Sequence, residues 1–144
     1  MKKISLFIVL LSVSAFVMAK GPAIKFSKTT HDFEKITEDG GLAKYDFEFE
    51  NTGDEALVVN SVRASCGCTT PTWTKTPVEP GKKGIISVAY NPKGRPGAFT
   101  KSITVTSNST VAEEQSLTLI IKGNVVSVVE KKATEVEKTE NSAK

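Results

Sequence analysis

The amino-acid sequence predicts an all-β fold, an antiparallel sandwich of two sheets with about seven strands. From residue 42 onward the apolar side chains recur at every second position, as in Tyr45, Phe47 and Phe49, which is the period of a half-buried strand. Glycine- and proline-containing turns separate the apolar runs at regular intervals, and beyond residue 19 no run of ten residues keeps helical spacing. A sandwich, in which the inward side chains of both sheets share one core, is therefore favoured over an open barrel.

The first expected element is a leader over residues 1–19. Lys2 and Lys3 give it a positive start, an apolar stretch follows over residues 4–17, and Ala19 is the small residue after which we expect cleavage. The apolar stretch is shorter than the roughly 20 residues that a membrane-spanning helix needs. We therefore expect an exported protein, periplasmic or secreted, with no transmembrane segment after leader removal.

The rest of the chain is expected to form one sandwich domain over residues 20–126 and a charged tail over residues 127–144. Turn chemistry at residues 51–54 indicates that the two strands flanking it form either a hairpin or a pair that crosses between sheets. The tail is too poor in large apolar side chains to offset the entropy lost on ordering, so we expect it to be flexible. Strands are expected at residues 23–27, 32–36, 43–50, 57–62, 84–90, 99–106 and 117–125.

The net charge argues against nucleic acid as a partner. The 19 basic and 16 acidic residues give +3, and removal of Lys2 and Lys3 with the leader leaves +1. So small an excess gives little attraction to a phosphate backbone or an anionic lipid surface.

The segment Ser-Cys-Gly-Cys-Thr at residues 65–69 is the one place in the sequence where reactive side chains cluster. In an extended strand the two cysteine Cα atoms would lie about 6.6 to 6.8 Å apart, the outer limit for a disulfide. The free backbone of Gly67 could let the chain contract, and an oxidising compartment favours closure. Loop entropy gives such a three-residue ring only about 1.6 kcal/mol, so a bridge here suits redox exchange better than structural support.

Two other states of the cysteine pair remain open. The thiols could be free or reversibly oxidised, or they could bind Cu(I) or Zn(II). A closed zinc site needs four ligands, and His31 is the one further soft or borderline donor in the processed chain. A local bridge is the favoured state, and we expect no resident metal or other cofactor.

Three residues flank this motif or could join it. Arg63 could favour a thiolate, although its side chain faces away from Cys66 if the strand continues. Trp73 is expected to cover an edge of the core, and His31 is expected to be an ordinary hydrogen-bonded or exposed histidine rather than a metal ligand.

The sequence does not predict an enzyme. It has a single histidine, no nucleophile elbow and no phosphate-binding glycine loop. Asp46, Glu48 and Glu50 alternate on the outward face of their strand, where such a row is usually solvated. The glycosylation pattern at residues 108–110 is a three-residue match of a kind that arises often by chance.

Several segments together resemble a bacterial exported family of unknown function that carries a Cys-Gly-Cys motif. The resemblance rests on residues 31–36, 47–53, 65–69, 80–92 and 94–97, and it extends over about residues 24–125. That family is similar to the abnormal-spindle, major-sperm-protein and Hydin domains. The resemblance implies an immunoglobulin-like sandwich and no established activity.

We therefore expect a non-enzymatic binding or assembly module of the cell envelope. Its partner would be a protein or another envelope component, held by loops or, preferably, by pairing with an edge strand. The alternative is a thiol-redox or Cu(I)-binding protein that uses Cys66 and Cys68.

Overall fold

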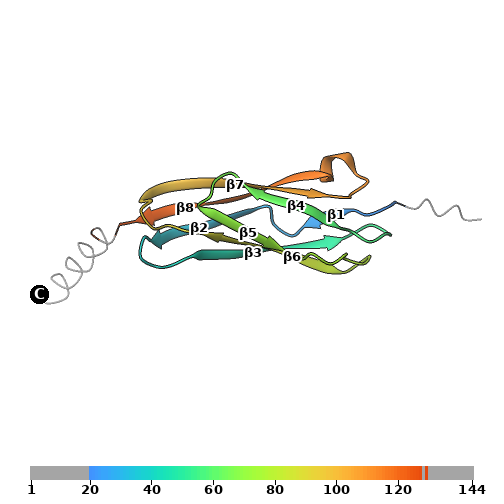
Figure 1. Ribbon diagram of the computed structural model, residues 1–144, viewed down its shortest axis with the longest axis horizontal. Coiled ribbons are helices and arrows are strands. Elements are labelled where there is room, and N and C mark those ends of the chain that lie inside the picture. The colour runs from blue at the N-terminus through green and yellow to red at the C-terminus, as the bar shows by residue number, and fades with distance from the viewer. Residues whose placement is uncertain (1–19, 128, 130–144) are drawn as a thin grey trace, which may run out of the picture.

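The computed structural model describes residues 20–127 and 129, which form eight strands and one short 3-10 turn (Figure 1). The expected leader and almost all of the expected tail lie outside the described residues. Within the part of the chain that is described, no helix is long and apolar enough to span a membrane. The elements are β1 (Ile24–Phe26), β2 (Thr30–Thr37), β3 (Ala43–Asn51), β4 (Val59–Ala64), β5 (Thr69–Trp73), β6 (Lys83–Tyr90), β7 (Gly97–Ser107), η1 (Ala112–Glu114) and β8 (Ser116–Val126).

The strands form two four-stranded sheets that pack face to face, which confirms the predicted sandwich (Figure 1). One sheet has the order β1-β3-β6-β5 and the other has the order β2-β8-β7-β4. Because β3 and β4 belong to different sheets, the turn after Asn51 connects a pair that crosses between sheets and not a hairpin.

The core follows the alternation that the sequence predicts. Phe47 and Phe49 of β3 are 1% and 0% exposed, while the residues between and beside them face solvent. The second sheet contributes Ile103, Leu119 and Ile121, which are fully buried. The inward side chains of both sheets therefore make one continuous apolar layer.

The chain passes from one sheet to the other between β1 and β2. β1 pairs antiparallel with β3, but β2 pairs parallel with β8, so the expectation of a wholly antiparallel sandwich is wrong for this pair. The connection between β1 and β2 covers only residues 27–29, so β2 continues in nearly the direction of β1 after the chain crosses to the other sheet. In that direction β2 lies parallel to its neighbour β8.

The structure has one strand more than the sequence predicts, because no strand is expected between residues 62 and 84, where β5 lies. Pro71 lies in the middle of β5, opposite Val88 of β6. A proline cannot donate to a ladder, and sheets accept it on an edge strand whose N–H position faces away from the neighbouring strand. Among the described strands β5 pairs with β6 alone, so it is such an edge.

Three connections gather toward the end of the sandwich at which β8 finishes (Figure 1). They join β2 to β3 (residues 38–42), β4 to β5 (residues 65–68) and β6 to β7 (residues 91–96). Strand register supports this grouping, because Tyr90 pairs with both Ala43 and Thr69. We call this region the disulfide end, because the connection over residues 65–68 contains the bonded pair Cys66 and Cys68.

Candidate functional site

A turn over residues 65–68 carries the two cysteines and crosses from one sheet to the other. The Ser65 N–H donates to the Ser102 carbonyl of β7 at 2.9 Å, and the Thr69 N–H donates to the Cys66 carbonyl at 3.3 Å. The Asn91 N–H donates to the Cys68 carbonyl at 2.9 Å. The turn is therefore held by backbone hydrogen bonds to both sheets and to itself.

Cys66 and Cys68 are joined in a disulfide. Their Cα atoms lie 5.3 Å apart, so the chain has contracted from the extended spacing into the range that a bridge requires. Metal ions bind the thiolate form of cysteine, and the bonded pair offers none. In this state the pair is suited to thiol-disulfide exchange and not to Cu(I) or zinc binding.

Gly67 contributes less than the sequence suggests. Its φ lies outside the left-handed region that favours glycine, and a Cβ added there would meet no atom within 4 Å. The contraction of the ring therefore does not depend on the special backbone freedom of glycine at this position.

The two sulfurs have different surroundings. Cys66 is half-buried beside the exposed Gly67, whereas Cys68 is a buried member of the core at 9% exposure. The hydroxyl of Thr69, itself 4% exposed, lies 3.7 Å from the Sγ atom of each cysteine. Sequence reasoning did not single out Thr69, because its position beside both sulfurs arises from the turn.

The residues that flank the motif do not converge on it. Arg63 is exposed and alternates with the core-facing Val62 on β4, so it lies on the solvent face of its sheet. Trp73 packs against the core, donates its Nε1–H to the Val59 carbonyl at 3.2 Å, and has the Lys75 ammonium 2.9 Å from its ring centroid. Neither side chain forms an interaction with the cysteines that would activate a thiol.

His31 takes part in an aromatic stack between the two sheets. Its ring lies parallel to that of Tyr45 with a centroid separation of 3.6 Å and meets the ring of Phe33 edge-on at 4.5 Å. Burial, and then the positive charge of Lys28, lower the pKa of His31. Within residues 20–127 and 129, no three or more histidine, cysteine or acidic side chains gather as a metal site.

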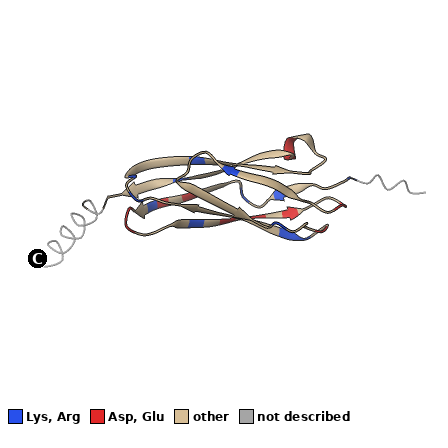
Figure 2. Cartoon of the chain, viewed as in Figure 1, with Lys and Arg blue, Asp and Glu red and all other residues tan. Residues whose placement is uncertain are grey.

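The other sequence candidates lie at ordinary surface positions. Asp46 accepts a hydrogen bond from the Ser87 hydroxyl, and Glu48 pairs with Lys83 at 2.7 Å on the outer face of the sheet. The Asn108 amide is engaged with the backbone, accepting from the Val58 N–H and donating to the Ala56 carbonyl. In the view of Figure 2, basic and acidic positions are scattered over both sheets.

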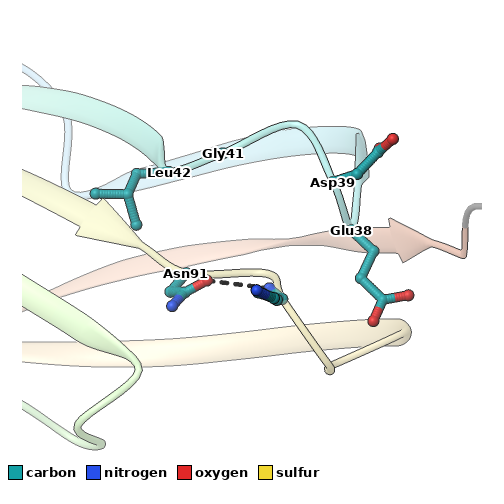
Figure 3. A pocket seen from close by; sticks show the side chains of 6 residues that line it. Glu38, Asp39, Gly41, Leu42 and Asn91 are labelled. Atoms are coloured by element: carbon teal, nitrogen blue, oxygen red, sulfur yellow. Dashed lines mark hydrogen bonds between the residues drawn. The ribbon is translucent and has the colours of Figure 1, made fainter.

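A pocket of about 470 Å³ opens between two of the three connections at the disulfide end (Figure 3). Leu42 lines it and is 54% exposed, so its side chain contributes apolar surface to the pocket. Asn91 lines the same pocket and joins it to the turn through its bond to Cys68. Sequence reasoning missed this site, although an apolar residue after Gly40 and Gly41 was a signal that could have revealed it. The lining residues are Glu38, Asp39, Gly41, Leu42, Asn91 and Lys93.

Hydrogen bonds fix the shape of this pocket. The Glu38 carboxylate accepts from the Gly94 N–H at 2.8 Å and so ties one loop to the other. Asn91 accepts from the Lys93 N–H at 3.1 Å, and the Arg95 guanidinium donates to the carbonyls of Asn91 and Lys93. Within residues 20–127 and 129, neither Glu38 nor Asp39 forms an ion pair.

Solved structures share this architecture. The chain is similar to a protein of unknown function from Porphyromonas gingivalis W83, with 19% identity and a TM-score of 0.63 over 78% of this chain and 51% of that one, so it spans about half of that protein. It is also similar to the ASH/PapD-like domain 7 of human CEP192, with 13% identity and a TM-score of 0.59 over 76% of this chain and 87% of that one.

The VesB protease of Vibrio cholerae is a third similar structure, with 12% identity and a TM-score of 0.57 over 72% of this chain and 31% of that one. At these identities the likeness shows the fold alone. The predicted likeness in fold to abnormal-spindle-type, immunoglobulin-like domains is confirmed. No curated protein matches the chain. A family model described as a protein of unknown function (DUF1573) matches residues 24–125.

Proposed function

The chain belongs to the DUF1573 family, and from that premise we propose that it is an exported, non-enzymatic binding or assembly module that contacts a partner protein of the cell envelope through its disulfide end. The fold supports this proposal because a sandwich holds its loops on a rigid frame, where they can bind without a catalytic centre.

The sheet edges are less suitable for binding than the loops. Pro71 interrupts the outer edge of β5, and β1 is three residues long. β2 has a register shift between Asp32 and Lys35, where Glu34 has a φ of 57°, and β4 has a register shift after Val59. Prolines, bulges, charges and short edges are the features by which proteins prevent strand addition. We therefore prefer loop contact to the edge pairing that the sequence alone suggested.

The single observation that carries the proposal is the exposure of Leu42 in the pocket at the disulfide end. Binding sites are commonly concave and combine apolar lining with a few polar groups, and this pocket has both. Glu38 and Asp39 line the same pocket, and among the residues that the structure describes neither carboxylate forms an ion pair. The partner segment that fits best has an apolar side chain for the pocket and a lysine or arginine for these carboxylates.

Site-specific photo-crosslinking in the native compartment tests this proposal. A crosslinking residue at position 42 should capture one protein reproducibly, and Leu42→Asp should abolish its recovery with the protein at native abundance. The matched control is Ile85, an apolar residue of β6 that is 43% exposed and does not line the pocket. Capture of the same protein from position 85, or its continued recovery with Leu42→Asp, contradicts the proposal.

Export is part of the proposal and has its own test. The intact mass of the protein purified from its compartment should correspond to a chain beginning at Lys20, less about 2 Da for the two hydrogens lost on disulfide formation. A mass that includes residues 1–19 would rule out the expected cleavage.

We propose thiol-disulfide exchange as a second candidate function, favoured by the bond between Cys66 and Cys68. A three-residue ring contributes little to stability, so stability gives little reason for the bond. Alkylation with and without prior reduction measures the state of the pair in the native compartment. A mixture of oxidised and reduced protein that shifts with added oxidant supports exchange, whereas one invariant state under both oxidant and reductant opposes it.

A further inference from the structure

We propose that Cys66 is the sulfur attacked by the thiolate of a partner protein, that Cys68 is the leaving group, and that Thr69 positions a hydroxyl to stabilise the departing thiolate. This assignment rests on the exchange function proposed above and adds to it a direction of attack, a class of substrate and a positioning residue.

Access distinguishes the two sulfurs. An attacking thiolate must approach the sulfur it attacks along the line of the disulfide bond, so the attacked atom needs an open side. Cys66 is half-buried and is followed by the exposed Gly67, which has open space where a side chain would be. Cys68 is 9% exposed and belongs to the core, so a protein thiol has less room to reach it.

The surroundings of Cys68 suit a leaving group. When the bond breaks, its electron pair stays on the Cys68 Sγ atom, and the buried location alone would disfavour the resulting charge. The Thr69 hydroxyl lies 3.7 Å from this sulfur, as it does from the Cys66 Sγ atom, and it can donate a hydrogen bond to the Cys68 thiolate and oppose that effect. Thr69 is 4% exposed and follows directly in β5, so its side chain is held in place.

The backbone keeps the Cys68 sulfur close to the site of attack. The Asn91 N–H donates to the Cys68 carbonyl, and the Thr69 N–H donates to the Cys66 carbonyl. Neither hydrogen bond includes a sulfur atom, so both remain when the disulfide opens. The released thiolate therefore stays within reach of Cys66 and can close the ring again if the partner does not complete the reaction.

The substrate is a protein dithiol, and the exchange balances in two steps. One partner thiolate bonds to the Cys66 Sγ atom, the Cys66–Cys68 bond breaks, and Cys68 leaves as a thiolate that takes up a proton. The second partner thiolate then bonds to the first partner sulfur and releases Cys66 as a thiolate, which also takes up a proton. The partner loses two electrons and two protons and gains a disulfide, while Cys66 and Cys68 become thiols.

The direct test uses glutathione as the thiol probe. The oxidised wild-type protein is mixed with reduced glutathione, quenched with acid within seconds, alkylated and digested, and the peptide of residues 64–75 is sequenced by mass spectrometry. We expect the glutathione adduct on Cys66 and the alkyl group on Cys68 in at least tenfold excess over the reverse arrangement. Equal amounts, or an excess of adduct on Cys68, overturn the assignment.

A second measurement tests Thr69 by a property that a purely structural residue would not change. In Cys66→Ser, the pH dependence of alkylation reports the pKa of the Cys68 thiol. Adding Thr69→Val should raise this pKa by about one unit, because the thiolate loses a charge-assisted hydrogen bond. Thr70→Val, at the exposed neighbouring position, is the matched control and should leave the pKa unchanged. An unchanged pKa with Thr69→Val refutes the role of its hydroxyl.

These outcomes separate the assignment from the function on which it rests. If the oxidised protein forms no glutathione adduct up to pH 9, the exchange function fails and the assignment fails with it. If adducts form without preference for Cys66, exchange stands and the assignment alone is wrong. Binding of a partner at the pocket is tested at Leu42 and is independent of both results.

Discussion

One buried amide, Asn51, connects several segments at the end of the molecule opposite the disulfide. Its side chain is 0% exposed and donates to the Glu55 and Val78 carbonyls at 2.7 and 2.8 Å. Its oxygen accepts from the Gly53 N–H at 2.9 Å. A residue that the sequence marks as part of a turn thus supports two connections, because it bonds Gly53 and Glu55 in its own turn and Val78, 27 residues away along the chain.

Asn51→Ala should destabilise the domain by about 2 to 4 kcal/mol, because it leaves buried backbone donors and acceptors without partners. Chemical denaturation of both proteins measures the difference in the free energy of unfolding. Thr52→Ala, at the exposed neighbouring position, is the control and should change stability by less than about 0.5 kcal/mol. A loss below 1 kcal/mol for Asn51→Ala would mean that water replaces the amide.

The stability of the protein should rise with pH where His31 titrates. Its pKa is lowered in the folded state by burial and by Lys28, so the unfolded chain binds this proton more tightly. The contribution of His31 is fully present above about pH 6.5 and is lost as the pH falls through the lower pKa of the folded protein. His31→Phe keeps an aromatic ring against Tyr45 without a titrating group.

Denaturation at pH 5 and pH 7 measures this dependence. We expect the wild-type protein to be less stable at pH 5 and the difference to shrink in His31→Phe. An identical pH dependence in the two proteins would assign the effect to other groups. Asp32 contributes in the same direction at lower pH, since a hydrogen bond from the Glu34 N–H lowers the pKa of its carboxyl.

At the scale of elements, two glycines show how strand packing distinguishes positions that the sequence alone does not. Gly84 lies in β6 opposite Phe49 of β3, and a Cβ at position 84 would overlap the Phe49 ring. Gly67 lies in the cysteine turn, and a Cβ there meets nothing within 4 Å. Close packing between β3 and β6 therefore requires a glycine at position 84, whereas no such contact requires one at position 67.

Gly84→Ala should lower the free energy of unfolding by about 1 to 3 kcal/mol, because the buried Phe49 ring must move. Gly67→Ala should change stability by less than about 0.5 kcal/mol and should form the disulfide as completely as the wild-type protein. Denaturation measures both effects, and intact mass measures the bridge. Failure of Gly67→Ala to oxidise would restore the view that the ring needs a glycine.

Strand prediction from the sequence succeeded where alternation is strong and failed where a local signal opposed it. β3 and β8 were predicted almost to their ends because their inward positions are consistently apolar. β5 was missed because Pro71 is a poor strand former except at an edge, and an edge is defined by neighbours and not by the segment itself. The parallel pairing of β2 with β8 depends likewise on which sheet the chain enters after β1.

For the whole molecule, the shared core and not the disulfide provides the stability. The three-residue ring can contribute at most about 1.6 kcal/mol by loop entropy, whereas the core joins residues from both sheets. The oxidised protein can therefore lose its bridge and remain folded, which an exchange function requires.

The double variant Cys66→Ser with Cys68→Ser should unfold in one cooperative transition and lose no more than about 1 to 2 kcal/mol. Urea denaturation followed by circular dichroism measures the loss, and a strand-type spectrum verifies the fold. Reduced wild-type protein is the control and should match the double variant. A loss above 4 kcal/mol would show that the bridge is a structural support, and exchange would then lose its main argument.

The sequence by itself determined the all-β class, the inward face of the main strands and the cysteine motif, since each is a property of residues close together in the chain. The tertiary structure alone decided which sheet each strand joins, that Thr69 lies beside both sulfurs, and that Leu42 and Asn91 line the same pocket. These features depend on contacts between segments far apart in the chain, and such contacts follow from how the whole core packs.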